Sequence, residues 1–227
     1  MDHRFKREMP HDSLYNGMVS YWKLEEASGV RADELGTHPL AESTNDPARA
    51  VGKHGYAADM EKGDTNQLTR ANASAGDLMG DDGSWTFAAW VNPESLANND
   101  RLLSAWPTTG APNRAYRLVV KSSDKMRLQV DEGGAIRAAE TASLSTSTWH
   151  HIVAQHNNGT DFRIKLDNAA WVVTSHTAGV QSSNQDFILG HSFDGLIDEA
   201  AWWSRSLTDL EIYWLYGNGK PLDLFSV

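Results

Sequence analysis

The chain has 227 residues, of which 40% are hydrophobic and 22% charged, and its formal net charge is −10. Nucleic-acid binding takes much of its affinity from Lys and Arg on phosphates, so this acidic balance argues against DNA and RNA as partners. The absence of cysteine excludes disulfides, thiolate metal ligands and cysteine nucleophiles. The length fits one undivided domain, because all-β sandwiches commonly reach this size.

The N-terminal residues are polar and of mixed charge. We expect residues 1–14 to form an arm in front of one sandwich domain, 15–227, with Pro10 preventing a helix from continuing. The segment lacks the apolar core of a secretory signal, and no later run is long enough to span a bilayer. We therefore expect synthesis in the cytoplasm, without membrane insertion, and release in a virion or by lysis.

Short apolar runs separated by turn-rich loops predict a β-sandwich, because sustained helical periodicity is rare along the chain. Alternating apolar residues in 84–92 indicate a strand inside a sheet, and Asp167-Asn168 predicts a hairpin turn. The expected strands lie near residues 18–24, 55–60, 67–71, 84–92, 101–106, 115–121, 125–130, 135–139, 148–156, 161–167, 170–174, 186–190 and 195–203.

One short helix is predicted near the C-terminus. Thr208 and Glu211 have the spacing of a capping box, in which each side chain accepts a hydrogen bond from the other residue's backbone. Leu207, Leu210 and Trp214 are expected to form its apolar stripe, and Gly217 is expected to begin its end. A helix of about two turns is marginal alone, so it should pack on the sandwich.

Seven short segments occur in an order and spacing that cover roughly residues 17–219. They are Val19–Gly29, Asp33–Gly36, Gly52–Ala57, Trp85–Val91, Thr148–Ala154, Ile164–Asn168 and Gly195–Glu199. Together they resemble the laminin-G-like branch of the concanavalin A-like jelly rolls. The departures are Asn168, where the family usually has Gly, and Ala200, where it has a branched apolar residue.

This resemblance implies an all-β fold, a two-sheet antiparallel jelly-roll sandwich with one short C-terminal helix. Such proteins mostly bind carbohydrate or protein ligands without chemistry, and many hold a structural calcium ion. The fold alone does not settle the function, because unrelated activities share it.

Two adjacent carboxylates, Asp198 and Glu199, lie in the apolar last strand. A buried carboxylate needs a metal, a charged partner or hydrogen bonds, so three explanations are open: a metal ligand, a catalytic acid or a structural tether. The resemblance places Asp33, Gly36 and Asp198 where a Ca²⁺ ion can be held, with Glu199 forming hydrogen bonds. The alternative is that Asp198 accepts backbone amides.

Catalysis is not expected. A retaining glycosidase needs two carboxylates about 5 Å apart, and the family's β-glucan hydrolases carry Glu-x-Asp-x-Glu on one strand face. The matching positions around Asp198 are Leu196 and Ala200, and strict alternation sends Glu199 to the opposite face. We therefore predict a protein that is not an enzyme.

A non-catalytic, glycan-binding module is the main functional hypothesis. Trp106, Tyr116 and Trp171 lie near predicted loops, where rings can stack on sugars while Arg101 and Arg114 bind hydroxyl groups. Burial in the core is the alternative for each ring. The alternative function is a phage virion component, a capsid decoration or tail protein anchored through the N-terminal arm to copies of itself or to capsid or tail proteins.

Overall fold

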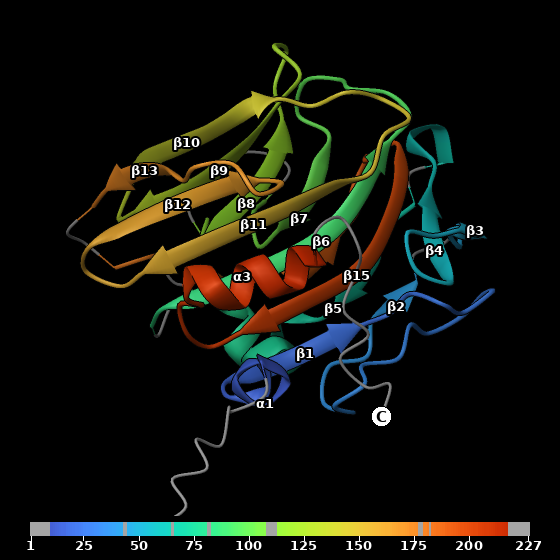
Figure 1. Cartoon of the computed structure of the whole chain (residues 1–227), viewed down its shortest axis with the longest axis horizontal. Coiled ribbons are helices and arrows are strands. Elements are labelled where there is room, and N and C mark those ends of the chain that lie inside the picture. Colours follow the sequence, from blue (N-terminus) through green and yellow to red (C-terminus); the bar gives the residue numbers. More distant parts are fainter. Residues whose placement is uncertain are drawn as a thin grey trace, which may run out of the picture.

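Two antiparallel β-sheets stack face to face in this computed structural model (Figure 1). The structure describes residues 10–42, 45–64, 66–80, 83–107, 113–176, 179–181 and 183–217. The eight-stranded sheet contains, in spatial order, β13 (Val172–Ser175), β12 (Asp161–Leu166), β11 (His150–Asn157), β6 (Trp85–Pro93), β15 (Gly195–Trp203), β4 (Tyr56–Met60) and β3 (Ala48–Val51), with β1 (Met18–Trp22) also paired to β15.

The seven-stranded sheet faces the eight-stranded one. Its spatial order is β10 (Ala135–Ser143), β9 (Lys125–Glu132), β8 (Tyr116–Val120), β7 (Arg101–Ser104), β14 (Phe187–Leu189), β5 (Leu68–Arg70) and β2 (Ala41–Glu42). The helical elements are α1 (Pro10–Tyr15), α2 (Asn72–Ala75), α3 (Asp209–Tyr216) and two 3₁₀ turns, Lys62–Asp64 and Gly76–Met79. The predicted fold class, an antiparallel two-sheet sandwich with a short C-terminal helix, is confirmed.

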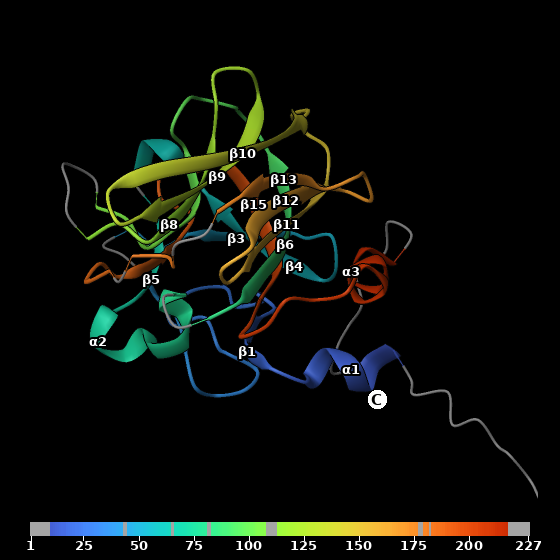
Figure 2. The ribbon, with the colours of Figure 1, turned by 90° about the vertical axis from the view of Figure 1, so that its left-hand side faces the viewer.

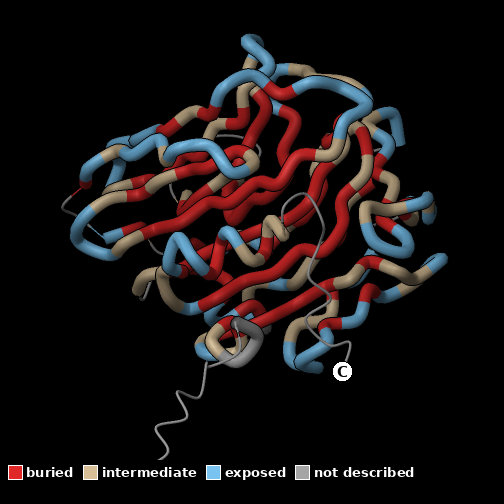
Figure 3. Tube along the Cα trace, viewed as in Figure 1, coloured by how far each residue is buried: buried red, intermediate tan, exposed pale blue. Residues whose placement is uncertain are grey.

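The main core lies between the sheets and is rich in aromatic rings. Trp85 and Trp202 stack with their ring centres 4.8 Å apart, and Tyr116 and Phe87 pack beside Trp202. A second apolar cluster, which includes Tyr21 and Trp203, lies on the outer face of the eight-stranded sheet under α1 and α3. Figure 2 shows both helices on the same side of the molecule, and Figure 3 shows the buried strands between exposed loops.

Pro10 begins α1, so residues 10–14 of the predicted arm are helical, and the segment that Pro10 was expected to keep from continuing as a helix lies outside the described residues. Proline suits the first helical position, because its missing N–H has no partner there anyway. Residues 1–9 of the predicted arm lie outside the described residues. No helix in the described ranges is long and apolar enough to cross a membrane.

Helix α3 has the predicted capping box and ends at Gly217, whose left-handed φ of 55° suits glycine. Its predicted apolar stripe is correct for the buried Leu207 and wrong for Leu210, which is 56% exposed, whereas Ile212 and Leu215 are buried. The buried face of α3 instead contains Glu211, Ile212 and Leu215, and Arg205 binds the Glu211 carboxylate there. Leu210 therefore lies on the exposed side of the helix. Strands β2 and β3 were not predicted, because their exposed residues carry no apolar alternation.

Candidate functional site

Arginine side chains gather on the outer face of the seven-stranded sheet. In β8, Leu118 and Val120 point into the core, so Arg117 and Val119 point outward. Cross-strand pairing then places Gln129 of β9 and Ser104 of β7 on either side of Arg117. The next outward row across the same strands holds Arg127, Val119 and Arg101.

Trp106 follows β7 and lies against this face. The guanidinium carbons of Arg114 and Arg117 are 5.3 and 4.7 Å from the centre of its indole ring. The Nη1 atom of Arg101 donates a hydrogen bond of 3.2 Å to the carbonyl oxygen of Trp106. We call the set Arg101, Trp106, Arg114, Arg117 and Arg127 the arginine face.

Two of the four arginines have a carboxylate partner. Arg114 Nε lies 2.7 Å from Asp131 Oδ2, and Arg127 pairs with Glu140. Arg101 is bonded to backbone carbonyls and Arg117 to the amide oxygen of Gln129 at 2.8 Å, and within the described ranges neither forms an ion pair. The arginine face therefore carries four positive charges against two negative ones, in a chain whose net charge is −10.

Burial and mutual repulsion act on this face. Burial, together with the charges of Arg101, Arg114 and Arg127, lowers the pKa of Arg117 to about 10. Burial also lowers the pKa of Arg101. Ser104, opposite Arg117 in the sheet, is fully buried, and its hydroxyl has no hydrogen-bond partner among the described residues.

The predicted ligand-binding residues separate into three places. Trp106, Arg101 and Arg114 come together on the arginine face. Tyr116 belongs to the core: its side chain is completely buried and its hydroxyl donates to the Leu78 carbonyl, so no sugar can stack on it in this structure. Trp106 is 5% exposed and covered by guanidinium groups, which replaces the expected open stacking surface with a cationic one.

Trp171 lies on the opposite side of the sandwich, before β13. Its Nε1 donates a 2.7 Å hydrogen bond to Asp209 at the start of α3. The charged groups of Arg163 and Lys165 lie 4.4 and 4.9 Å from its ring centre. These contacts fasten α3 to the sheet, and Trp171 shares no contact with the arginine face in the described chain.

Sequence reasoning missed Arg117 and Arg127. Both occupy outward positions of strands whose inward residues are apolar, so alternation alone assigns them to a solvated face. The signal that unites them with Arg101 is the register of β7, β8 and β9, which places residues from distant parts of the sequence side by side. That register cannot be read from the residue pattern of any single strand.

Asp198 and Glu199 lie at a β-bulge in β15. Ile197 and Ala200 both enter the main core although they are three positions apart, an odd spacing, so alternation breaks between them. Asp198 pairs with the outward-facing Trp90, and Glu199, with a φ of 52°, accepts a hydrogen bond from the Tyr21 hydroxyl. The prediction that the two carboxylates point to opposite faces is therefore wrong.

A loop closes over Asp198. Its Oδ2 accepts the backbone N–H of His54 at 2.9 Å, and its Oδ1 has no hydrogen-bond partner among the described residues. The loop approaches so closely that a Cβ on Gly52 would lie 2.6 Å from Asp198 Oδ2. Burial raises the pKa of Asp198 to about 7, although backbone hydrogen bonds from His54 and Lys53 favour the charged form. The enclosure makes Asp198 a tether between β15 and this loop.

The Asp33 carboxylate, predicted as a calcium ligand, accepts several hydrogen bonds within the described residues. Its carboxylate accepts backbone N–H groups of Tyr21 and His38, each at 2.9 Å, and bonds from the backbone and hydroxyl of Thr37 at 3.1 and 3.0 Å. Burial alone would raise the pKa of Asp33, but these hydrogen bonds lower it below its usual value. Both carboxylate oxygens are thus already in use.

The predicted calcium ligands each take part in hydrogen bonds of the protein itself. Gly36 donates its N–H to the Asp33 carbonyl at 2.7 Å. Tyr21, whose backbone N–H Asp33 accepts, pairs with Ala201, which follows Asp198 in β15 across the bulge. One Ca²⁺ needs all its oxygen ligands at about 2.3–2.6 Å. Within the described ranges no three His, Asp or Glu side chains converge as a metal site requires.

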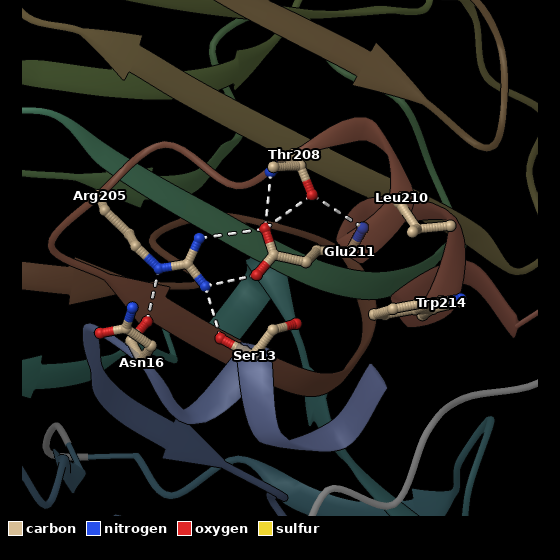
Figure 4. A pocket seen from close by; sticks show the side chains of 7 residues that line it. All are labelled: Ser13, Asn16, Arg205, Thr208, Leu210, Glu211 and Trp214. Carbon is tan, nitrogen blue, oxygen red and sulfur yellow. Dashed lines mark hydrogen bonds and ion pairs between the residues drawn. The ribbon is translucent and has the colours of Figure 1, made fainter. Parts of the chain in front are cut away.

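A shallow pocket of about 300 Å³ lies between α1 and α3 (Figure 4). At its centre Arg205 donates two hydrogen bonds, of 3.0 and 2.6 Å, to the Glu211 carboxylate. The same guanidinium reaches the backbone carbonyls of Asn16 and Ser13 at the end of α1. Burial opposes ionisation, but the bonds from Arg205 and Thr208 lower the pKa of Glu211 to about 2. The polar groups that line the pocket are therefore hydrogen-bonded to one another and join α1 to α3.

The fold defines the class of protein, an antiparallel two-sheet β-sandwich. A family model described as the Concanavalin A-like lectin/glucanases superfamily matches residues 63–213, and the chain belongs to this superfamily. The expected family resemblance is confirmed. No curated protein matches the sequence.

Solved structures of several proteins share the fold. Domain 4 of AbnA, a GH43 extracellular arabinanase from Geobacillus stearothermophilus solved with arabinotriose, is 17% identical with a TM-score of 0.70, covering 87% of this chain and 97% of that one. Botulinum neurotoxin type C, whose cell entry depends on two ganglioside molecules, is 8% identical with a TM-score of 0.66, over 91% of this chain and 52% of that one.

A sialidase from Trypanosoma rangeli, in complex with a difluorinated sugar-acid analogue, is also similar. It is 15% identical with a TM-score of 0.63, covering 88% of this chain and 32% of that one. The chain thus spans about half of the toxin structure and a third of the sialidase structure. At such identities these similarities establish the fold, and their ligands are properties of those proteins.

Proposed function

We propose that this protein is a non-catalytic, glycan-binding module that uses the arginine face. The observation that carries the proposal is the row of guanidinium groups around Trp106, two of which lack a carboxylate partner among the described residues. Planar guanidinium groups donate several hydrogen bonds in fixed directions, which suits the hydroxyl and acid groups of sugars. The arabinotriose and ganglioside ligands of two structurally similar proteins support this choice.

The environment of the acidic residues in β15 supports the absence of catalysis. Asp198 is fully buried and Glu199 is 8% exposed, so a polysaccharide cannot reach them while the loop over Asp198 is closed. The flanking positions, Leu196 and Ala200, supply no second acid on that strand. No hydrolysis products should form when the protein is incubated with β-glucan or arabinan, and released reducing ends would contradict this proposal.

A glycan array tests the binding function directly. The full chain should bind at least one immobilised glycan, and Arg114→Ala should weaken that binding. Arg49→Ala is the matched control, because Arg49 also lies over a ring, 4.0 Å from the centre of Tyr56, but belongs to the other sheet. Absence of binding to all neutral and acidic glycans on the array would overturn the proposal.

The virion alternative depends on the N-terminal arm. Residues 1–9 lie outside the described residues, and the part of the chain that follows them, α1, packs on the chain's own α3 and β15 through Leu14. No observation on the described residues favours a capsid or tail partner over a glycan, so binding is the function that the geometry supports best.

A further inference from the structure

The ligand's chemistry follows from the charge balance of the arginine face. Four guanidinium groups repel one another there, and Asp131 and Glu140 neutralise two of them. Arg101 is 8% exposed, so it has lost most of its hydration without gaining a carboxylate among the described residues. Resting on the proposed glycan-binding function, we infer that the arginine face recognises an acidic sugar, one that carries a carboxylate or sulfate group.

The distribution of partners shows where the acid group binds. Arg114 and Arg127 are held by acids at the two sides of the face, and their side chains are 17% and 28% exposed. Arg117 lies between them in the sheet and has only the neutral Gln129 as a side-chain partner through Nε. Its remaining N–H donors suit a planar carboxylate or a sulfate, which accept two parallel hydrogen bonds from one guanidinium.

Ser104 gives a second, independent indication. Its hydroxyl is fully buried, lies directly opposite Arg117 in the β7–β8 pairing, and has no hydrogen-bond partner among the described residues. A buried polar group without a partner is costly, so such groups are rare in stable proteins. Because Ser104 is completely buried, its hydroxyl lies beneath the arginine face, and a ligand oxygen held by Arg117 reaches it only if the side chains above it move aside.

The sequence between the two halves of the site agrees with this inference. Residues 108–112, which link Trp106 and Pro107 to Asn113 and Arg114, are Thr-Thr-Gly-Ala-Pro and contain no acidic side chain. The connection therefore contributes no carboxylate of its own to balance the arginines. An acidic sugar supplies the missing negative charge.

The experiment compares matched acidic and neutral glycans by isothermal titration of the full chain. The probes are tetragalacturonate against its fully methyl-esterified form, and 3′-sialyllactose against lactose. Chondroitin sulfate against unsulfated chondroitin distinguishes sulfate from carboxylate recognition. We expect at least one acidic member to bind roughly tenfold or more tightly than its neutral partner, since hydrogen bonds to charged groups are the stronger ones.

Arg117→Gln should lower that affinity by roughly tenfold while leaving the melting temperature unchanged or raised, because it removes one of four repelling charges. Arg117→Lys, which keeps the charge but loses the fork of donors, should restore part of the affinity. Arg49→Gln should change nothing. A purely structural role for Arg117 would instead lower the melting temperature and leave the preference for acidic glycans intact.

The possible failures are distinguishable. Equal affinity for acidic and neutral members, or binding of neutral glycans alone, overturns the acidic ligand but leaves the glycan-binding function standing. Acidic preference that survives both Arg117→Gln and Arg101→Gln places the site elsewhere and overturns this assignment. No binding to any glycan of either kind overturns the proposed function itself.

Discussion

Replacing Asp198 with Asn should change how stability depends on pH. The pKa of this carboxyl is raised from about 3.8 in the unfolded chain to about 7 in the folded one, mainly by burial. A raised folded pKa means that folding favours the protonated form, so its contribution is complete below pH 3.8 and is lost progressively as the pH rises to 7. At 1.36 kcal/mol per pH unit, the wild type should lose about 3 kcal/mol between pH 5 and pH 8 through this group.

The Asn side chain is isosteric with the protonated acid and does not titrate, so Asp198→Asn removes this dependence. Its amide oxygen can still accept the His54 N–H, but its NH₂ enters a buried position without an acceptor, which costs about 1–3 kcal/mol at every pH. The variant should therefore be less stable than the wild type at pH 5 and similar or more stable at pH 8.

Urea unfolding at pH 5, 6, 7 and 8 in the presence of EDTA measures the effect. The quantity to compare is the change in unfolding free energy from pH 5 to pH 8, wild type minus variant. Asp124→Asn is the control, because Asp124 is an exposed turn residue with a positive φ of 59° that Asn also adopts. If the wild type and Asp198→Asn lose the same free energy over this range, Asp198 does not titrate near pH 7 and the argument from its burial is wrong.

Two further predictions concern the other carboxylates. Glu211→Gln should destabilise the protein by about 2 kcal/mol at pH 7, since it weakens two charged hydrogen bonds from Arg205. Because the folded pKa of Glu211 is lowered to about 2, the difference from wild type in thermal unfolding should shrink as the pH falls from 4.5 to 2, and a constant difference would contradict it. If calcium is bound through Asp198, EDTA should lower the melting temperature and Asp198→Ala should remove most of that effect; a melting temperature insensitive to both chelation and added Ca²⁺ would refute this prediction.

Local patterns in the sequence predicted much of the fold because each involves neighbouring residues. The turn at Asp167, with a φ of 52°, and the capping box of Thr208 and Glu211 both depend on side chains only a few positions apart. The bulge at Asp198 and Glu199 does not. The bulge lies where one neighbour of β15 changes from β4 to β1. The residue pattern of a single strand does not show which strands it will pair with, so it cannot predict this bulge.

The candidate site was predictable only in part for the same reason. Trp106, Arg101 and Arg114 were expected from their place near loops, and the structure does unite them. Tyr116 was misassigned because it is the first residue of β8, and the sequence does not distinguish a strand's first residue from a loop's last one. In the structure Tyr116 lies on the side of β8 that faces the core. Arg117, the next residue, became visible as a site residue only through the pairing of β8 with its neighbours.

An acidic ligand for an acidic protein is physically consistent. At physiological ionic strength charges are screened over about 8 Å, so a ligand held on the arginine face senses the local excess of guanidinium groups more than the distant carboxylates. A single acidic sugar places its one negative group among Arg101, Arg117 and their neighbours and exposes little further charge. Duplex DNA carries one charge per roughly 1.7 Å of its axis, so its remaining phosphates would extend over a surface where acids outnumber bases. The same charge distribution therefore argues against duplex DNA and admits an anionic group of a sugar at one place.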